Sequence, residues 1–221
     1  GVRSFDGTTW AQQAISGATA SAFAHITQFK QRVWFCKDAS LAAYFLNTGA
    51  VSGTASSFDL SSFCRLGGEL TAITGWTFDA GDGLDDFWVG VTSNGEIIVY
   101  QGTDPTSATT WAMVGRWEVG KPLSRRCFTK FGGDVLYLAD DGVWPLSTLL
   151  REERTKPSRA LSYKIADAIR KAANNYRTNF GWQLLYWPRE TMVLANIPLR
   201  AGVEQSQYAM NSITKAWGRF T

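Results

Sequence analysis

The chain has 221 residues, a formal net charge of +3, 45% hydrophobic residues and 14% aromatic residues. This hydrophobic content excludes a disordered chain, and no apolar run approaches the roughly 18 residues that cross a bilayer, so we expect no membrane span. The small net charge does not by itself indicate nucleic-acid binding.

Aromatic-rich apolar runs separated by turn residues recur along the chain and predict antiparallel strands. Four similar segments cover residues 29–38, 84–91, 131–140 and 187–196, and each joins polar or turn-forming residues to a short apolar run. The copies recur about every 50 residues, near the length of a four-stranded propeller blade. We therefore predict an all-β fold of repeated antiparallel sheets: residues 1–221 form a β-propeller fragment of about four blades or part-blades.

Two turn sequences predict hairpins within these repeats. Asn94-Gly95 separates two apolar runs, and an Asn-Gly pair tolerates the positive φ angles of a tight turn. Asp140-Asp141-Gly142 has the same place in a later repeat. Pro145 follows shortly after it and predicts an edge strand or the end of a strand, because proline cannot donate to a ladder.

Residues 157–176 depart from the β pattern and predict one inserted amphipathic helix. Ser158 is the expected N-cap, and Asn174-Asn175 marks the expected end. The apolar residues at helical spacing are Leu161, Ile165, Ala168, Ile169, Ala172 and Tyr176.

Basic residues concentrate around this helix. Residues 151–177 contain eight basic and three acidic side chains, a local net charge of +5. Such a surface could dock an acidic partner or meet passing nucleic acid, and the alternative is a solvated helix face. The candidate partner-docking residues are Arg159, Lys164, Arg170, Lys171 and Arg177.

The sequence lacks the residues of common catalytic sites. His25 is the single histidine and is interpreted as structural or surface-exposed, and no hydrolase, zinc-protease or phosphate-loop motif occurs. Cys36, Cys64 and Cys127 are an odd number without CxxC spacing, which favours free, mostly buried thiols in a reducing compartment over disulfides or zinc. We expect no enzyme, no cofactor and no metal centre.

Four aspartates in a glycine-rich stretch are the one candidate ion loop: Asp79, Asp82, Asp85 and Asp86. Carboxylate oxygens on such a loop could bind Ca²⁺, although the spacing matches calcium loops only weakly. The alternatives are a solvated loop before a strand or, less favoured, catalytic carboxylates.

Four tryptophans leave a second function open. Flat rings stack on sugars, so Trp76, Trp111, Trp117 and Trp182 could serve a carbohydrate- or ligand-binding, lectin-like propeller, and core packing is the competing interpretation. A glycosidase on a propeller is the third alternative, weakened by the lack of a recognisable carboxylate pair.

Two stretches resemble tail proteins of short-tailed bacteriophages. Residues 207–220 have a strand followed by Asn, two residues, Thr, one residue, Ala-Trp, one residue and Arg-Phe, and residues 134–143 resemble the Asp-Gly hairpin of the same proteins. The resemblance implies a structural propeller of the virion tail or head-tail junction, assembled in the host cytoplasm, that helps to close or stabilise the portal channel. It further implies portal, adaptor or tail components as partners, possible homo-oligomers, and DNA that passes nearby without sequence-specific binding.

Overall fold

The computed structural model describes residues 1–79, 84–151 and 156–220. The chain divides into two compact units, Gly1–Arg116 and Trp117–Thr221. Each unit is described by itself below.

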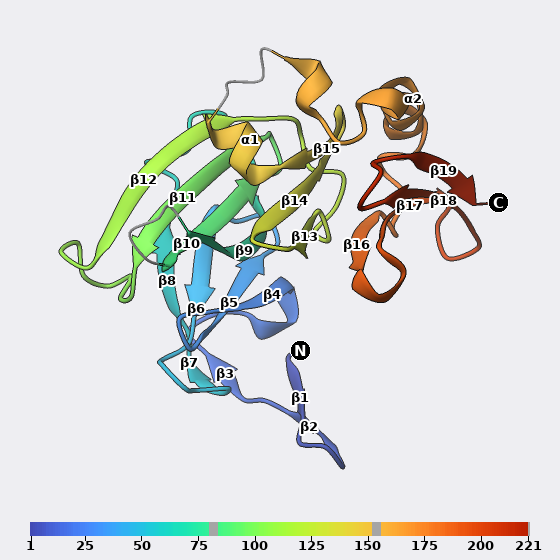
Figure 1. The fold of residues 1–221 in the computed structure, drawn as a ribbon. Helices are drawn as coiled ribbons and strands as arrows, with labels where there is room; N and C mark the ends of the chain where they lie inside the picture. Colours follow the sequence, from blue (N-terminus) through green and yellow to red (C-terminus); the bar gives the residue numbers. More distant parts are fainter. Residues whose placement is uncertain (80–83, 152–155, 221) are drawn as a thin grey trace. The chain divides into compact units, whose positions relative to one another are not determined.

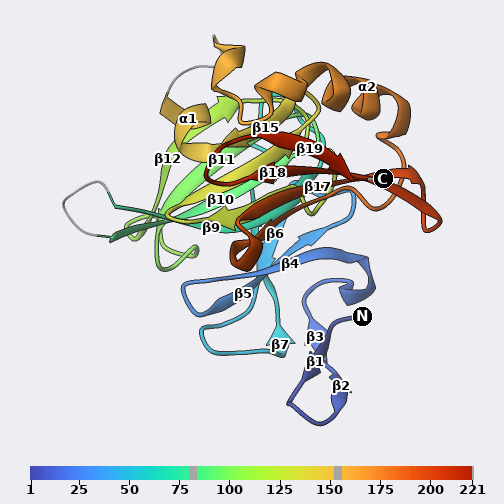
Figure 2. The same ribbon diagram turned by 45° about the vertical axis from the view of Figure 1, so that its right-hand side comes forward.

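The first unit begins with short paired strands and then forms a four-stranded antiparallel sheet (Figure 1). The hairpin β1–β2 extends away from that sheet, as Figures 1 and 2 both show. The short elements are β1 (Arg3–Phe5), β2 (Trp10–Gln12), β3 (Ile15–Ser16), η1 (Ala20–Ala22) and β7 (Gly53–Thr54), with β3 and β7 paired in parallel. The sheet has the order β4 (Phe23–Phe29), β5 (Arg32–Lys37), β6 (Ala42–Phe45) and β8 (Ser56–Asp59).

A second four-stranded sheet follows in the same up-and-down order. Its strands are β9 (Leu70–Asp79), β10 (Leu84–Thr92), β11 (Glu96–Gly102) and β12 (Trp111–Glu118). The Asn94-Gly95 hairpin is confirmed: Val91 pairs with Ile97, and Gly95 has a φ of 88°. A positive φ at this position is why glycine fits the turn.

The two sheets of the first unit share an aromatic core. Trp34 on β5, Trp88 on β10 and Trp111 on β12 meet with ring centroids 5.5 to 6.2 Å apart. The first strands of the two sheets, β4 and β9, lie in contact, and the His25 ring nitrogen lies 2.9 Å from the Ile73 carbonyl oxygen. Large rings that pack edge-to-face and stacked therefore join the sheets.

The first sheet of the second unit has three strands, one fewer than each of the four-stranded sheets. It consists of β13 (Phe128–Phe131), β14 (Asp134–Ala139) and β15 (Gly142–Pro145) in that order. The Asp140-Asp141 turn is confirmed, because Ala139 pairs directly with Gly142. Pro145 is the last residue of the edge strand, also as predicted.

Residues 160–162 occupy the outer edge of β15 in place of a fourth strand. The Val143 carbonyl accepts the Leu161 N–H at 2.9 Å, and the Val143 N–H donates to Ser162 Oγ at 2.8 Å. These bonds satisfy backbone groups that an edge strand otherwise leaves open.

The last sheet has four strands and adjoins the three-stranded one. Its order is β16 (Gln183–Trp187), β17 (Met192–Arg200), β18 (Glu204–Asn211) and β19 (Trp217–Phe220), with η4 (Pro188–Glu190) between β16 and β17. β13 and β16, the first strands of the two sheets, are in contact. The Leu184 N–H donates to the Arg126 carbonyl at 3.2 Å, and the Phe131 and Tyr186 rings lie 4.9 Å apart.

The prediction of one helix over 157–176 is wrong in its extent. The structure has α1 (Leu146–Arg151), η2 (Pro157–Arg159), η3 (Tyr163–Ile165) and α2 (Ala166–Tyr176). Ser158 is not the N-cap: Ile165 precedes α2 and makes no side-chain cap bond. The physical reason is that Leu161 and Ser162 bind the edge of β15, so the regular helix starts after them. The buried face of α2 carries Ile169 and Ala172 from the predicted stripe.

The four sequence repeats mark equivalent places in the sheets. Each copy contains all or the start of a second strand: β5, β10, β14 and β17. The fold is thus mostly β and built from several antiparallel sheets, as predicted. Among the described residues, no helix is long and apolar enough to span a membrane.

Candidate docking site in the second unit

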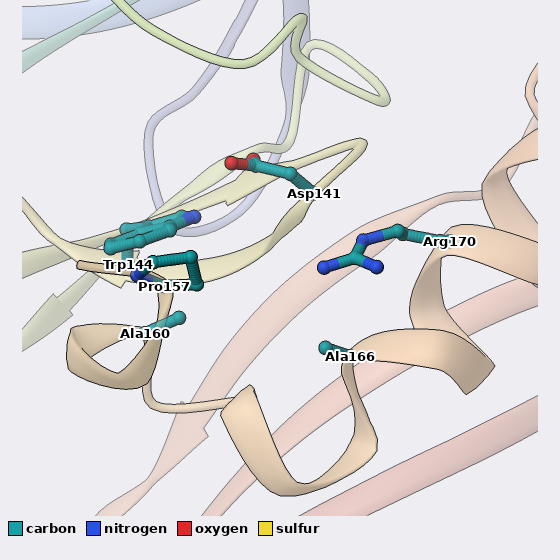
Figure 3. Close-up of a pocket in the computed structure, with 6 residues that line it drawn as sticks. All are labelled: Asp141, Trp144, Pro157, Ala160, Ala166 and Arg170. Atoms are coloured by element: carbon teal, nitrogen blue, oxygen red, sulfur yellow. The ribbon is translucent and has the colours of Figure 1, made fainter. Parts of the chain in front are cut away.

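A pocket of about 220 Å³ lies beside the β14–β15 hairpin in the second unit (Figure 3). Asp141 and Trp144 come from the hairpin, and Arg170 comes from α2. Pro157, Ala160 and Ala166 supply apolar walls from residues 157–176, called the helical insertion below, which contain η2, η3 and α2. Figure 3 shows the Arg170 guanidinium and the Asp141 carboxylate directed toward the side of the pocket on which the Trp144 ring lies.

The hairpin side of the pocket is held by hydrogen bonds. The Tyr137 hydroxyl donates to the Gly120 carbonyl at 2.6 Å, and the Asp140 carboxylate accepts the Lys121 N–H at 3.1 Å. Gly120 has no room for a side chain, because a Cβ there would lie 2.4 Å from the Asp141 carboxylate. The turn that carries Asp141 is therefore held in place by Gly120 and Lys121.

The helical side of the pocket is tied to both sheets of the unit. Besides the two bonds to Val143, the Leu161 carbonyl accepts the Trp217 indole N–H at 2.8 Å. Arg177, at the C-terminal end of α2, donates to Asp140 at 2.7 Å. α2 also contacts β15 and β17. The insertion is thus a packed part of this unit, which preorganises the pocket.

The structure brings only some of the predicted docking residues together. Arg170 lines the pocket and lies 3.3 Å from Asp167, and Arg177 is held at the hairpin by Asp140. Lys164 lines a neighbouring hollow of about 450 Å³ that also includes Arg170. Lys171 is exposed on α2, and Arg159 is exposed on η2.

Asp141 and Trp144 are pocket residues that the sequence did not single out. The sequence indicates Asp141 only as part of a hairpin turn, and no motif points to Trp144. The signal that could have found them is the Asp-Asp-Gly turn followed within the same hairpin by a tryptophan. Asp141 and Trp144 line the same pocket as Arg170 only because α2 packs beside the hairpin. A local sequence pattern does not predict that packing.

The candidate ion loop lies largely outside the described part of the chain. Asp82 and the side chains of Asp79 and Asp85 belong to the part that the structure does not describe. The Asp86 carboxylate binds Lys30 Nζ at 2.6 Å and accepts the Thr77 hydroxyl at 2.7 Å. Asp86 thus has protein partners, and an ion at this loop stays a prediction.

Burial limits the sugar-binding interpretation of the four tryptophans. Trp76, Trp111 and Trp182 are 7%, 5% and 1% exposed, so their rings offer almost no face to a sugar. Trp117 is half-buried. An apolar hollow of about 340 Å³ does adjoin Trp111, and its other lining residues include Phe58, Phe63, Tyr100 and Met113. Burial raises the pKa of the Tyr100 hydroxyl to about 12.

Among the described residues, none of the three cysteines forms a disulfide, and Cys36 and Cys127 are buried while Cys64 is partly buried. Burial and, second, the nearby Glu96 carboxylate raise the pKa of Cys64 to about 11. Burial also raises the pKa of Cys127. The thiolate is the reactive form, so these thiols should react slowly near neutral pH.

We therefore expect native protein at about pH 8 to react with a thiol-specific disulfide reagent at least about tenfold more slowly than unfolded protein. In concentrated guanidinium chloride all 3 thiols should react at the rate of free cysteine. Absorbance of the released chromophore measures both rates. If one thiol per native chain reacted as fast as free cysteine, this would contradict the raised pKa of Cys64. A Cys64→Ser variant would show whether the fast thiol is Cys64.

No family model matches the sequence, and no curated protein matches it. Among solved structures, the chain is similar to one described as the complex of the fission yeast SREBP-SCAP binding domains, at 12% identity and a TM-score of 0.39. The match covers 88% of this chain and 59% of that chain, so this chain spans less than two thirds of its length. At this TM-score the likeness carries no argument about function.

Proposed function

We propose that the protein is a non-enzymatic structural component of a phage tail or head-tail junction, with propeller-like sheets as its scaffold. The contact between the first strands of successive sheets supports this propeller-like scaffold. β4 contacts β9 in one unit, and β13 contacts β16 in the other. In a propeller, up-and-down sheets are arranged radially with their first strands innermost. Such a scaffold is rigid and acts through its surfaces.

One sheet face of the second unit fits an incomplete propeller. Leu185 and Trp187 are two residues apart on β16, and the pairing register places Phe220 on the same face. Their side chains are 42%, 47% and 51% exposed, whereas Leu184 and Val193 on the other face are buried. A sheet buries its apolar faces against other layers, so this face suits a further sheet of the closed assembly.

The helical insertion is the proposed docking element for other virion proteins. The exposed side chains of Arg170 and Lys171 give the surface of α2 a positive charge, which favours an acidic partner. The partners proposed on this ground are portal, adaptor or tail components.

The double variant Arg170→Glu, Lys171→Glu should fold normally and assemble poorly. Both side chains are exposed, so we expect a change of no more than about 0.5 kcal/mol in the free energy of unfolding. Charge reversal should lower incorporation into particles by about tenfold or more. Quantitative mass spectrometry of purified particles measures incorporation.

The matched control is Arg189→Glu, Arg200→Glu, which makes the same charge change at sites 87% and 71% exposed. Equal incorporation of the two double variants would remove α2 from the docking role.

The virion assignment itself has a direct test. Phage particles from the source of this chain should contain its peptides at a fixed ratio to the portal protein, and immunogold labelling should locate them at the tail vertex. Absence from purified particles would refute the assignment. Specific signals on a glycan array would instead support the lectin-like alternative.

A further inference from the structure

We infer that the pocket formed by Asp141, Trp144 and Arg170 binds a primary carboxamide, the side chain of an asparagine or glutamine on a partner protein. This inference rests on the proposed docking role of the helical insertion and names the chemistry that the site recognises. Its volume of about 220 Å³ is larger than an asparagine or glutamine side chain, so the pocket can admit one. Pro157, Ala160 and Ala166 would contact the aliphatic part of that side chain.

The indole N–H of Trp144 is the first observation. Trp144 is 4% exposed, and its Nε1 has no hydrogen-bond acceptor among the described residues. Two other tryptophans of this unit do have acceptors: Trp182 donates to the Tyr176 carbonyl at 2.9 Å and Trp217 to the Leu161 carbonyl at 2.8 Å. A buried donor without an acceptor is unfavourable, and a ligand oxygen at this N–H would supply the missing acceptor.

The indoles of the first unit differ from Trp144 in their surroundings. Within the described part of the chain Trp34, Trp88 and Trp111 also lack a conventional acceptor, but they pack against one another and against further rings. Ring faces accept N–H groups weakly. Trp144 lies instead at a pocket wall, with Arg170 and Asp141 facing the same space (Figure 3).

The polar groups of the pocket match both ends of a carboxamide. The Trp144 N–H and the Arg170 guanidinium are donors for its oxygen, and the Asp141 carboxylate is an acceptor for its NH₂ group. A carboxylate has about four acceptor positions, so Asp141 can receive this bond in addition to its interaction within the chain. A ligand carboxylate would meet repulsion from Asp141, and an ammonium group would face two donors that it cannot satisfy.

The hydrogen bonds around the pocket favour a preformed site. The Asp140-Asp141 turn is fixed by Lys121 and Arg177, and the opposite wall is fixed to Val143 through Leu161 and Ser162. A site held in place in this way loses little further freedom on binding.

Three small probes of nearly equal size separate the possible ligand classes: propionamide, propionate and propylammonium. With the full chain labelled with ¹⁵N-tryptophan, propionamide should shift the Trp144 indole resonance at millimolar concentration. Its affinity should exceed that of each other probe by about fivefold or more. Tighter binding of propionate, or no shift with any probe, would overturn the inference.

Two variants test the assigned roles through the methyl signal of the ligand, observed by saturation transfer. Trp144→Phe should lower propionamide affinity by about fivefold or more, because it removes the donor and keeps a ring. Asp141→Asn should reverse the preference toward propionate, because it replaces an acceptor with a donor. Glu190→Gln, an exposed carboxylate on η4, is the control and should change neither affinity.

Unchanged probe selectivity in Asp141→Asn would contradict the inference even if Trp144→Phe proved too unstable to measure. The probe titration does not depend on particle assembly. Suppose that propionamide does not bind but that the Arg170→Glu, Lys171→Glu variant still assembles poorly. This result would refute carboxamide binding and leave the docking role of α2 intact. A carboxamide-selective pocket in a protein absent from virions would refute only the virion assignment.

Discussion

Replacing Trp88 by alanine should lower the free energy of unfolding by about 3–5 kcal/mol, as expected for removal of a large ring from a packed core. Trp88 is 0% exposed, and its ring contacts those of Trp34, Tyr100 and Trp111 at 5.5 to 6.2 Å. Because Trp34 belongs to the neighbouring sheet, the substitution removes contacts between sheets as well as within one. Urea denaturation followed by far-ultraviolet circular dichroism measures the loss.

Trp10→Ala is the matched control for Trp88→Ala. Trp10 is 67% exposed on β2 and contacts Phe5 at 5.2 Å. Truncation of such an exposed ring should cost less than about 1 kcal/mol. Equal losses in the two variants would mean that the aromatic cluster does not hold the two sheets together.

Replacing Glu96 by alanine should lower the free energy of unfolding by about 3–5 kcal/mol, the range for breaking a buried charged pair. Glu96 is 0% exposed at the start of β11, and its two carboxylate oxygens accept the backbone N–H groups of Arg65 and Leu66, each at 2.8 Å. Arg116 Nε lies 3.8 Å from the same carboxylate. Alanine would leave the two N–H groups without acceptors and would remove the charge that compensates Arg116.

Two further variants separate the causes of this loss. Glu96→Gln keeps one acceptor oxygen and should lose about half as much stability. Glu118→Ala removes an exposed glutamate on β12 and should change stability by no more than about 0.5 kcal/mol. Hydrogen exchange at the Arg65 and Leu66 amides should rise in Glu96→Ala. Unchanged exchange at these amides would show that Glu96 does not hold that loop.

Several elements of the fold could be predicted because their causes are local. The Asn94-Gly95 and Asp140-Asp141 turns were predicted from residues that tolerate tight-turn geometry, and both connect strands as expected. Pro145 ends an edge strand because it has no N–H for a ladder. The repeated apolar runs mark the second strand of each sheet, since such a strand has a neighbour on both sides and is largely buried.

The start of the regular helix in the helical insertion could not be predicted from the local sequence. The apolar spacing of residues 161–176 is helical, yet regular helix begins only at Ala166. Leu161 and Ser162 instead bind Val143, a residue that precedes them by about 20 positions in a different element. Such a competing contact leaves no trace in the helix pattern, because it depends on the open edge of β15.

By itself, the sequence determined that this protein is a chain of antiparallel sheets joined by tight turns, because strand alternation and turn chemistry act between near neighbours. Only the tertiary structure decided that Asp141, Trp144 and Arg170 line one pocket and that Glu96 holds the loop at Arg65 and Leu66. The physical reason is distance along the chain. Hydrogen bonds and charges between residues some 30 positions apart depend on how whole elements pack, which no periodic pattern encodes.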